Sequence, residues 1–190
     1  MCRKLEYPTI AVTNRYLCSV PLPKQMERLA GLGVKAVILR EKDMTEPEYE
    51  KLAKEMLEAG NRLGVPVILH TFWEAARRLS CESIHLPLPL LRRDPDIAEG
   101  FALVGTSVHS LEEAQEAQRL GVSYMTAGHV FATDCKKGLP PRGLAFLERI
   151  CCEVSVPVYG IGGIGAGNAQ DVMQSRAAGV CMMSELMKQE

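Results

Sequence analysis

Short apolar runs that are rich in β-branched residues alternate along the chain with longer stretches in which apolar residues recur every three or four positions. The short runs are typical of buried strands and the longer stretches of amphipathic helices. The alternation therefore predicts consecutive strand–helix units that build a parallel sheet. The expected strands cover residues 9–13, 35–39, 65–69, 83–86, 102–108, 124–127, 156–161 and 180–183. The expected helices cover residues 23–32, 46–63, 72–79, 111–120, 143–154 and 168–177.

Eight strands are the number at which such units close into a small (β/α)8 barrel, also called a TIM barrel. The 190 residues give about 24 per unit, which is short for this fold. A doubly wound open sheet is the alternative, but no GxGxxG motif follows the first strand, where a nucleotide-binding sheet would carry it. We find no long linker or low-complexity segment, so we expect one domain over residues 1–190.

The fourth unit departs from the pattern, because its strand is followed by the run Leu86-Pro87-Leu88-Pro89-Leu90. Proline lacks a backbone donor and restricts the conformation of the residue before it. The run therefore should not form a regular helix, and we expect a short or irregular connection at this point.

The composition is that of an ordinary globular protein, with 47% hydrophobic and 24% charged residues, and argues against disorder. The net charge is -1 and the 22 basic residues are scattered, so we expect no nucleic-acid partner. The amino-terminus lacks the apolar run of a signal peptide, and no stretch approaches the roughly 18 apolar residues of a membrane span. We therefore expect a cytoplasmic enzyme that does not contact a membrane.

The seven cysteines, an odd number without regular spacing, fit a reducing compartment better than a disulfide framework. Cys151 and Cys152 form an adjacent pair with no CxxC partner, so the ligand spacing of a structural zinc site is missing. We expect no metal site.

Reactive groups of a (β/α) barrel lie at the carboxyl ends of the strands and in the loops that follow. Polar side chains gather at these positions of the expected strands, and all four histidines of the chain fall among them. One histidine there would more often be structural, but four at one rim indicate a catalytic mouth. The residues of this rim are Asn14, Arg15, Arg40, Glu41, Lys42, His70, Thr71, His85, Ser107, His109 and His129.

The seventh strand ends in the glycine-rich sequence YGIGGIG over residues 159–165, just before a predicted helix. Glycines let backbone amides approach an anion, and a helix amino-terminus adds a favourable partial charge. Gly162 and Gly163, together with Ser184 at the start of the last helix, therefore predict a phosphate site after strands seven and eight, where barrels commonly hold one. The alternative is that the glycines only form a tight turn.

The segment 128–138, GHVFATDCKKG, follows the sixth strand and lies at the predicted catalytic mouth. It holds His129, Thr133 and the adjacent pair Lys136 and Lys137, and glycines bound it at both ends. The lysines either belong to a flexible flap that attracts an anionic substrate or stand as solvated surface charges.

Three motifs resemble those of the thiamine-phosphate-synthase and TenI superfamily. Residues 37–42, VILREK, are similar to its VQLREK segment, and residues 105–110, GTSVHS, are similar to its GxSxH segment. Residues 158–164 are similar to its glycine-rich loop after strand seven. The resemblance covers residues 9–187 and implies a small (β/α) barrel that acts in thiamine biosynthesis.

The chain departs from the synthases of this superfamily, which bind magnesium pyrophosphate through an Asn-Asp pair after strand three and an Asp after the HLG of strand four. Here His70-Thr71 and the apolar run after Leu86 occupy those places, and Ile38 replaces the Gln of VQLREK. Magnesium prefers oxygen ligands, usually one or two carboxylates together with substrate phosphates. The loss of these carboxylates counts against pyrophosphate displacement.

The segment GHVFATDCKKG instead resembles the TenI thiazole tautomerase branch, because the synthases carry a GPxFxTxTK-like loop there. In that branch the histidine of the segment, here His129, is the expected acid–base residue. The resemblance implies aromatisation of a 2-carboxythiazole phosphate tautomer. This proton relocation needs no cofactor, and magnesium would be required only for synthase chemistry.

Histidine suits such a reaction because its unperturbed pKa of about 6.5 lets it accept and donate protons near neutrality. We expect His129 to move the proton, while Arg40 and Lys42 neutralise substrate charge and Arg40 clamps a carboxylate. The further substrate-binding candidates are His70, Ser107, Thr133 and Lys137.

Three alternatives stay open beside the tautomerase. The first is a thiamine-phosphate synthase, and the second is a non-catalytic regulator that keeps the phosphate site. The third is a histidine metalloenzyme, which no HxH pair or acidic bridge supports. The expected partner is a small phosphorylated thiazole, and the sequence leaves the oligomeric state open, a homo-oligomer included.

Overall fold

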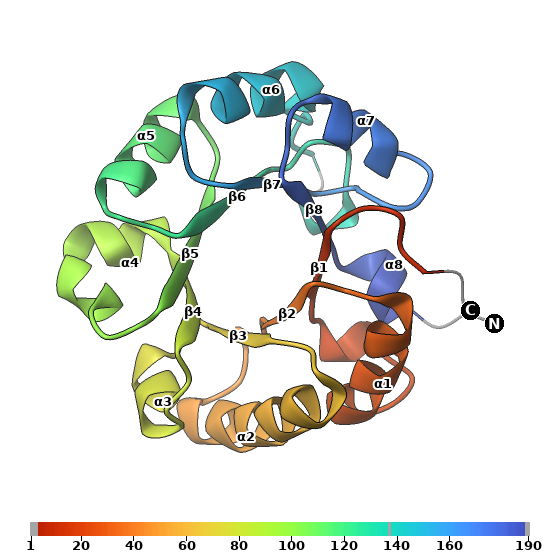
Figure 1. Cartoon of the computed structure of the whole chain (residues 1–190), viewed down its shortest axis with the longest axis vertical. Helices are drawn as coiled ribbons and strands as arrows, with labels where there is room; N and C mark the ends of the chain where they lie inside the picture. Colours follow the sequence, from red (N-terminus) through yellow and green to blue (C-terminus); the bar gives the residue numbers. More distant parts are fainter. Residues whose placement is uncertain (1–3, 137, 189–190) are drawn as a thin grey trace.

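The computed structural model describes residues 4–136 and 138–188. Eight parallel strands form a closed barrel in sequential order, in which β1 pairs with both β2 and β8 (Figure 1). The strands are β1 Thr9–Val12, β2 Ala36–Leu39, β3 Val67–His70, β4 Ser83–Pro87, β5 Leu103–Val108, β6 Tyr124–Gly128, β7 Val158–Ile161 and β8 Gly179–Met182. The predicted (β/α)8 barrel is thereby confirmed.

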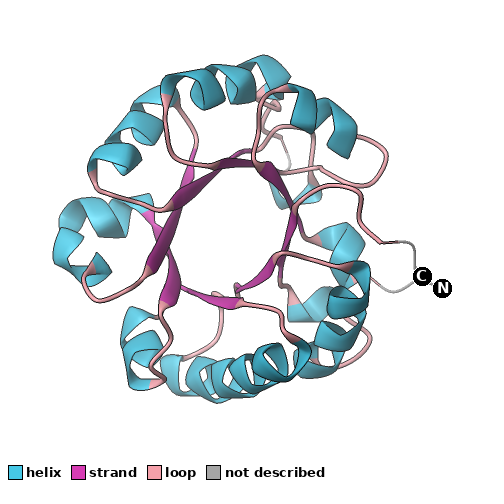
Figure 2. Cartoon of the chain, viewed as in Figure 1, coloured by secondary structure: helices cyan, strands magenta, loops and turns pink. Residues whose placement is uncertain are grey.

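The helices surround the barrel as an outer ring (Figure 2). They are α1 Leu22–Leu32, α2 Glu46–Leu63, α3 Trp73–Arg78, α4 Leu88–Arg93, α5 Leu111–Arg119, α6 Gly143–Glu153, α7 Ala169–Gln174 and α8 Ser184–Met187. Three short 3-10 helices add to them, η1 Arg15–Leu17, η2 Pro95–Ala98 and η3 Asp134–Lys136. In the described part of the chain, no helix has both the length and the apolar character needed to cross a membrane.

Alternate strand residues face the two sides of the barrel wall. Val37 and Leu39 of β2 pack outward into the main core against the helices, whereas Ile38 belongs to a smaller interior cluster. The interior cluster comprises Ile10, Val12, Ala36, Ile38, Ile68, Tyr124 and Cys181. Side chains therefore fill the barrel itself, and a site can form only above this layer.

Two strands begin two residues later than the sequence predicts, and proline is the reason in both. We expected strands from residues 65 and 156, but β3 begins at Val67 and β7 at Val158. Each follows a proline whose carbonyl accepts a bond from the neighbouring strand, Pro66 from Val37 and Pro157 from Met125. Because proline has no N–H to donate to the neighbouring strand, regular pairing begins one residue later.

The connection after β4 is short, as predicted, but it is helical. The helix α4 begins at Leu88, so the last three residues of the run that we expected to be irregular form its first turn. Pro89 sits in that first turn, where its missing N–H costs no hydrogen bond. The prediction that the run forms no regular helix was wrong for this reason.

Candidate active site

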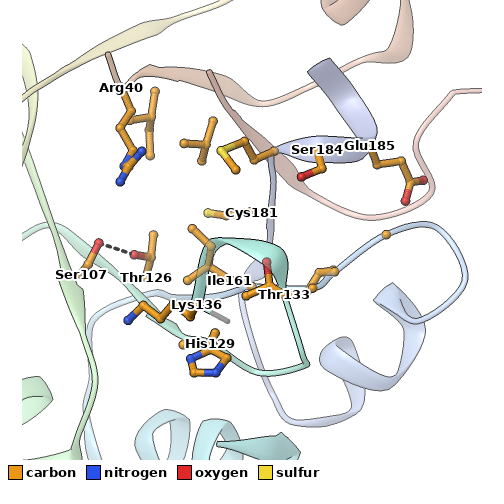
Figure 3. A pocket seen from close by; sticks show the side chains of 18 of the residues that line it. Arg40, Ser107, Thr126, His129, Thr133, Lys136, Ile161, Cys181, Ser184 and Glu185 are labelled. Carbon is orange, nitrogen blue, oxygen red and sulfur yellow. Dashed lines mark hydrogen bonds between the residues drawn. The ribbon is translucent and has the colours of Figure 1, made fainter. Parts of the chain in front are cut away.

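A cavity of about 870 Å³ opens at the carboxyl ends of the strands, where the sequence predicts the catalytic mouth. All four histidines line it. So do the described site candidates, which are Arg40, Lys42, His70, Ser107, His129, Thr133, Gly162, Gly163 and Ser184. The remaining candidate, Lys137, lies outside the described residues. In Figure 3, Arg40 and His129 lie at opposite sides of the cavity.

The cavity floor is a chain of hydrogen bonds centred on His85. The ring of His85 lies 2.9 Å from the Tyr124 hydroxyl through Nδ1 and 2.9 Å from Ser107 Oγ through Nε2. Ser107 Oγ in turn lies 2.9 Å from Thr126 Oγ1 (Figure 3). Burial, together with the charges of Lys42 and Arg40, lowers the pKa of His85 to about 3. His85 is therefore neutral near pH 7 and orients Ser107.

Gly105 of β5 makes room for this floor. A Cβ at Gly105 would lie 2.2 Å from the ring of Tyr124, so only glycine lets that ring lie inside the barrel. The GxSxH motif thus contributes twice, because its glycine admits Tyr124 and its serine joins the same chain of hydrogen bonds.

His70 is a second neutral histidine of the cavity. Its Nδ1 lies 2.7 Å from Thr71 Oγ1, and its ring stacks on that of His85 with centroids 5.4 Å apart. Burial lowers the pKa of His70 to about 2, and His85, Lys42 and Arg40 add to the effect. Near neutrality His70 can therefore offer hydrogen bonds but no positive charge.

Of the two cations after β2, Arg40 is anchored by Thr13, the residue that follows β1. The backbone N–H of Arg40 donates to Thr13 Oγ1 at 2.9 Å, and Thr13 donates to the buried Glu41 carboxylate at 2.6 Å. Glu41 also accepts from the backbone N–H of Arg15 and from its guanidinium. Burial, assisted by Arg40 and Lys136, lowers the pKa of Lys42. This part of the cavity thus combines basic groups that favour an anion.

His129 follows the last residue of β6 and is almost fully buried, with 6% of its surface exposed. Its Nε2 lies 3.3 Å from the carbonyl oxygen of Leu139. A carbonyl only accepts, so this ring nitrogen carries the proton and Nδ1 of the neutral ring is the acceptor. Nδ1 is buried, and no hydrogen-bond partner for it exists among the described residues.

The glycine-rich loop after β7 packs directly against His129. Gly162 has φ +100°, and a Cβ there would lie 2.4 Å from Cβ of His129. The amides of Val130 and Phe131 donate to the carbonyls of Ile161 and Gly162 at 2.9 and 3.0 Å. The loop that carries His129 is thus held against the predicted phosphate loop.

The phosphate loop is also fixed from within and from α8. Asn168 accepts from the Gly165 amide and donates to the Gly163 carbonyl, both at 2.9 Å. The carboxylate of Glu185 accepts from the Ala166 amide at 2.9 Å, so this amide is already engaged. Ser184, the first residue of α8, lies on the same cavity wall as Glu185 (Figure 3).

His109 is a cavity residue that the sequence placed at the rim but not among the site candidates. Its Nδ1 lies 2.7 Å from the carbonyl oxygen of Gly128, and its backbone N–H donates to Glu113 at 2.6 Å. Thr126 lines the cavity without having been singled out, whereas His85 was named at the rim and Lys136 in the segment 128–138. The period-two alternation of β6, which points Thr126 inward with Tyr124, was the available signal for Thr126.

The sequence profile of the family described as thiamine monophosphate synthase matches residues 9–186. The chain belongs to the thiamine monophosphate synthase family. It is 36% identical to a thiamine-phosphate synthase of Desulfitobacterium hafniense, over 98% of this chain and 92% of the relative. It is 30% identical to a thiamine-phosphate synthase of Syntrophomonas wolfei, over 96% of this chain and 89% of the relative.

Among solved structures, the thiamine phosphate pyrophosphorylase of Pyrococcus furiosus superposes with a TM-score of 0.82 and 26% identity, covering 96% of this chain and 88% of its own. The protein is therefore an enzyme of thiamine biosynthesis in the thiamine monophosphate synthase family. The names of these relatives favour a synthase, and thus a transferase, over the tautomerase branch that the segment 128–138 suggests.

Synthases of this family use magnesium, so the donor set of the cavity bears on the reaction. Among the described residues that line the cavity, Glu185 is the only carboxylate, and it is engaged with Ala166. The described residues also contain no cluster of three or more His, Cys, Asp or Glu side chains suited to a metal ion. The described cavity residues therefore do not fit a magnesium ion held by protein carboxylates.

Proposed function

We propose that this member of the thiamine monophosphate synthase family is a thiazole tautomerase, which converts a 2-carboxythiazole phosphate tautomer to its aromatic form. The buried, unpartnered Nδ1 of His129 is the observation that carries the proposal. A buried polar atom without a partner costs roughly 1–3 kcal/mol. His129 lines the cavity, and its unsatisfied nitrogen is explained if it acts on a bound molecule.

The cavity offers a place for each charged end of this substrate. The phosphate would bind at Gly162, Gly163 and Ser184, all of which line the cavity. The carboxylate would bind at the basic side, where the planar fork of Arg40 suits two carboxylate oxygens and Lys42 adds charge. Further contacts to the substrate are proposed for His70, Ser107, Thr133 and Lys137.

The reaction itself requires only proton movement. The non-aromatic tautomer carries a hydrogen on a ring carbon, and aromatisation breaks that C–H bond and leaves its electron pair in the ring. A new C–H bond forms at the far end of the displaced double bond, so the atoms of substrate and product are the same. His129 takes or returns this proton through Nδ1. The contacts to the phosphate and the carboxylate hold the thiazole ring in position for this transfer.

The names of the relatives support a second candidate, the joining of a pyrimidine pyrophosphate to the thiazole phosphate. The missing carboxylates count against it, as described above. A third possibility is a regulator that binds the thiazole phosphate and leaves it unchanged.

One pair of assays separates these candidates. The purified protein is mixed with the carboxythiazole tautomer, and the rise in ultraviolet absorbance of the aromatic ring is followed. A parallel reaction contains the pyrimidine pyrophosphate, the aromatic thiazole phosphate and magnesium, and thiamine phosphate is measured. We expect turnover only in the first assay. Turnover only in the second would establish a synthase, and binding of the aromatic product without turnover in either would establish a regulator.

A further inference from the structure

Two histidines that line the cavity carry their protons on opposite ring nitrogens. The carbonyl of Gly128 accepts from Nδ1 of His109 at 2.7 Å, so Nδ1 of His109 carries a proton in every protonation state of the ring. The carbonyl of Leu139 fixes the reverse arrangement at His129, where Nε2 carries the proton. The nitrogen left to act is therefore Nε2 at His109 and Nδ1 at His129.

The ring of His109 is hydrogen-bonded to the backbone next to His129. Gly128, which accepts from His109, directly precedes His129 in the chain. His109 is fixed on its other side, because Glu113 accepts from its backbone N–H at 2.6 Å and Ser110 caps the helix α5 that carries Glu113. The positions of the two imidazoles are thus coupled through β5 and β6, which are neighbours in the barrel.

Burial distinguishes the two histidines. The Nδ1 of His129 is buried and has no hydrogen-bond partner among the described residues, so this nitrogen is left to accept a proton. His109 is only partly buried at the cavity wall, where an imidazolium can exchange its proton with water. The other two histidines of the cavity do not compete for this role, because burial lowers the pKa of His70 to about 2 and that of His85 to about 3.

We infer that His109 is a second catalytic residue, a general acid that delivers a proton through Nε2 while His129 removes one through Nδ1. The inference rests on the proposed tautomerase function. A tautomerisation takes the proton from one atom and adds a proton at another, so two fixed groups serve it without the movement of a single base across the ring. His129 becomes an imidazolium and His109 becomes neutral. The starting state returns when His129 has released its proton and His109 has taken one up, through water that enters the cavity after the product leaves.

The test uses two variants with different consequences. In His109→Asn, the side-chain amide stands near the position of Nδ1 and can still donate to Gly128, but no acid remains. In His109→Ala, the ring is replaced by a space that free imidazole can enter. We expect kcat of both variants to fall at least about 100-fold, a typical contribution of one acid–base group, and KM to stay within about threefold. The kcat of His109→Ala should rise as the concentration of added imidazole is increased.

Two readouts distinguish an acid from a residue that only supports the loop. The alkaline limb of the pH profile of kcat should disappear in His109→Asn. In deuterated water, the substrate left by this variant should acquire deuterium at the ring carbon, because His129 still removes its proton, whereas substrate left by His129→Asn should not.

Turnover of His109→Asn within about threefold of the wild type, with the same pH profile, would overturn the role of His109 while the proposed function stands. Loss of activity without imidazole rescue, or with weakened binding of the aromatic product, would also overturn it and assign His109 a structural role. Absence of turnover in the wild-type protein overturns the proposed function itself, so the two failures are told apart by the wild-type control.

Discussion

The Oγ atom of Ser107 lies 2.9 Å from Nε2 of the buried ring of His85. His85→Leu removes this bond and also leaves the Tyr124 hydroxyl without its partner. We expect the free energy of unfolding to fall by about 1–3 kcal/mol for the groups left unsatisfied. Adding Tyr124→Phe removes one of these groups, so the double variant should recover part of the loss in urea unfolding. A double variant less stable by the sum of both single effects would contradict the proposed bonding.

The buried histidines His70 and His85 predict a pH dependence of stability. Burial lowers their pKa values to about 2 and about 3, whereas the unfolded chain has the ordinary value of about 6.5. The unfolded state therefore binds more protons below pH 6.5, and stability is lost as the pH falls. The slope for each histidine approaches about 1.4 kcal/mol per pH unit.

The measurement is urea unfolding between pH 6.5 and 5, above the titration of ordinary carboxylates, with about 3.9 for Asp and 4.3 for Glu. His70→Asn removes one of the two groups, so its stability should fall less steeply with acidification than that of the wild type. Parallel curves for the two proteins would show that His70 is not held neutral by the fold.

Glu41 predicts a separate effect on substrate affinity. Glu41→Gln weakens the carboxylate bonds to Thr13 and Arg15, and stability should fall by about 1–3 kcal/mol. Because Thr13 also accepts from the Arg40 amide, KM for the carboxythiazole tautomer should rise. Asp43→Asn is the matched control, since it breaks an exposed bond to the same arginine and should change KM and stability little. Equal effects of the two substitutions would refute the anchoring role.

The close packing of Gly162 against His129 predicts that a side chain at position 162 lowers kcat. Gly162→Ala places a Cβ 2.4 Å from that of His129 and forces a residue with a side chain to φ +100°. We expect a loss of at least about 1 kcal/mol in stability and about 100-fold in kcat, because a shift of about 1 Å at a catalytic group has an effect of that size. Gly31→Ala in α1, where a Cβ meets nothing within 4 Å, should leave kcat unchanged. Wild-type kcat in Gly162→Ala would disprove the close packing.

The sequence predicts the barrel well because period and spacing are local properties. The same pattern predicts which polar residues follow the strand ends. It therefore correctly predicts Arg40, His70 and His129 at the cavity. The two largest errors at strand starts, in β3 and β7, and the missed helix after β4 all occur at a proline whose effect depends on its position in the element.

The proton positions on the histidines could not be predicted in this way. They depend on which backbone carbonyl accepts a hydrogen bond from each ring, Gly128 for His109 and Leu139 for His129. Loop conformation and the close packing at Gly162 determine these contacts. The neutral state of His85 depends likewise on burial by neighbours that are distant in the sequence.

The aromatisation rate of His129→Asn tests whether this histidine is the base of the reaction. We predict that kcat falls at least about 100-fold, because the unpartnered ring nitrogen is the base, while the dissociation constant of the aromatic carboxythiazole phosphate stays within about threefold. Near-normal turnover of the tautomer by this variant would contradict it.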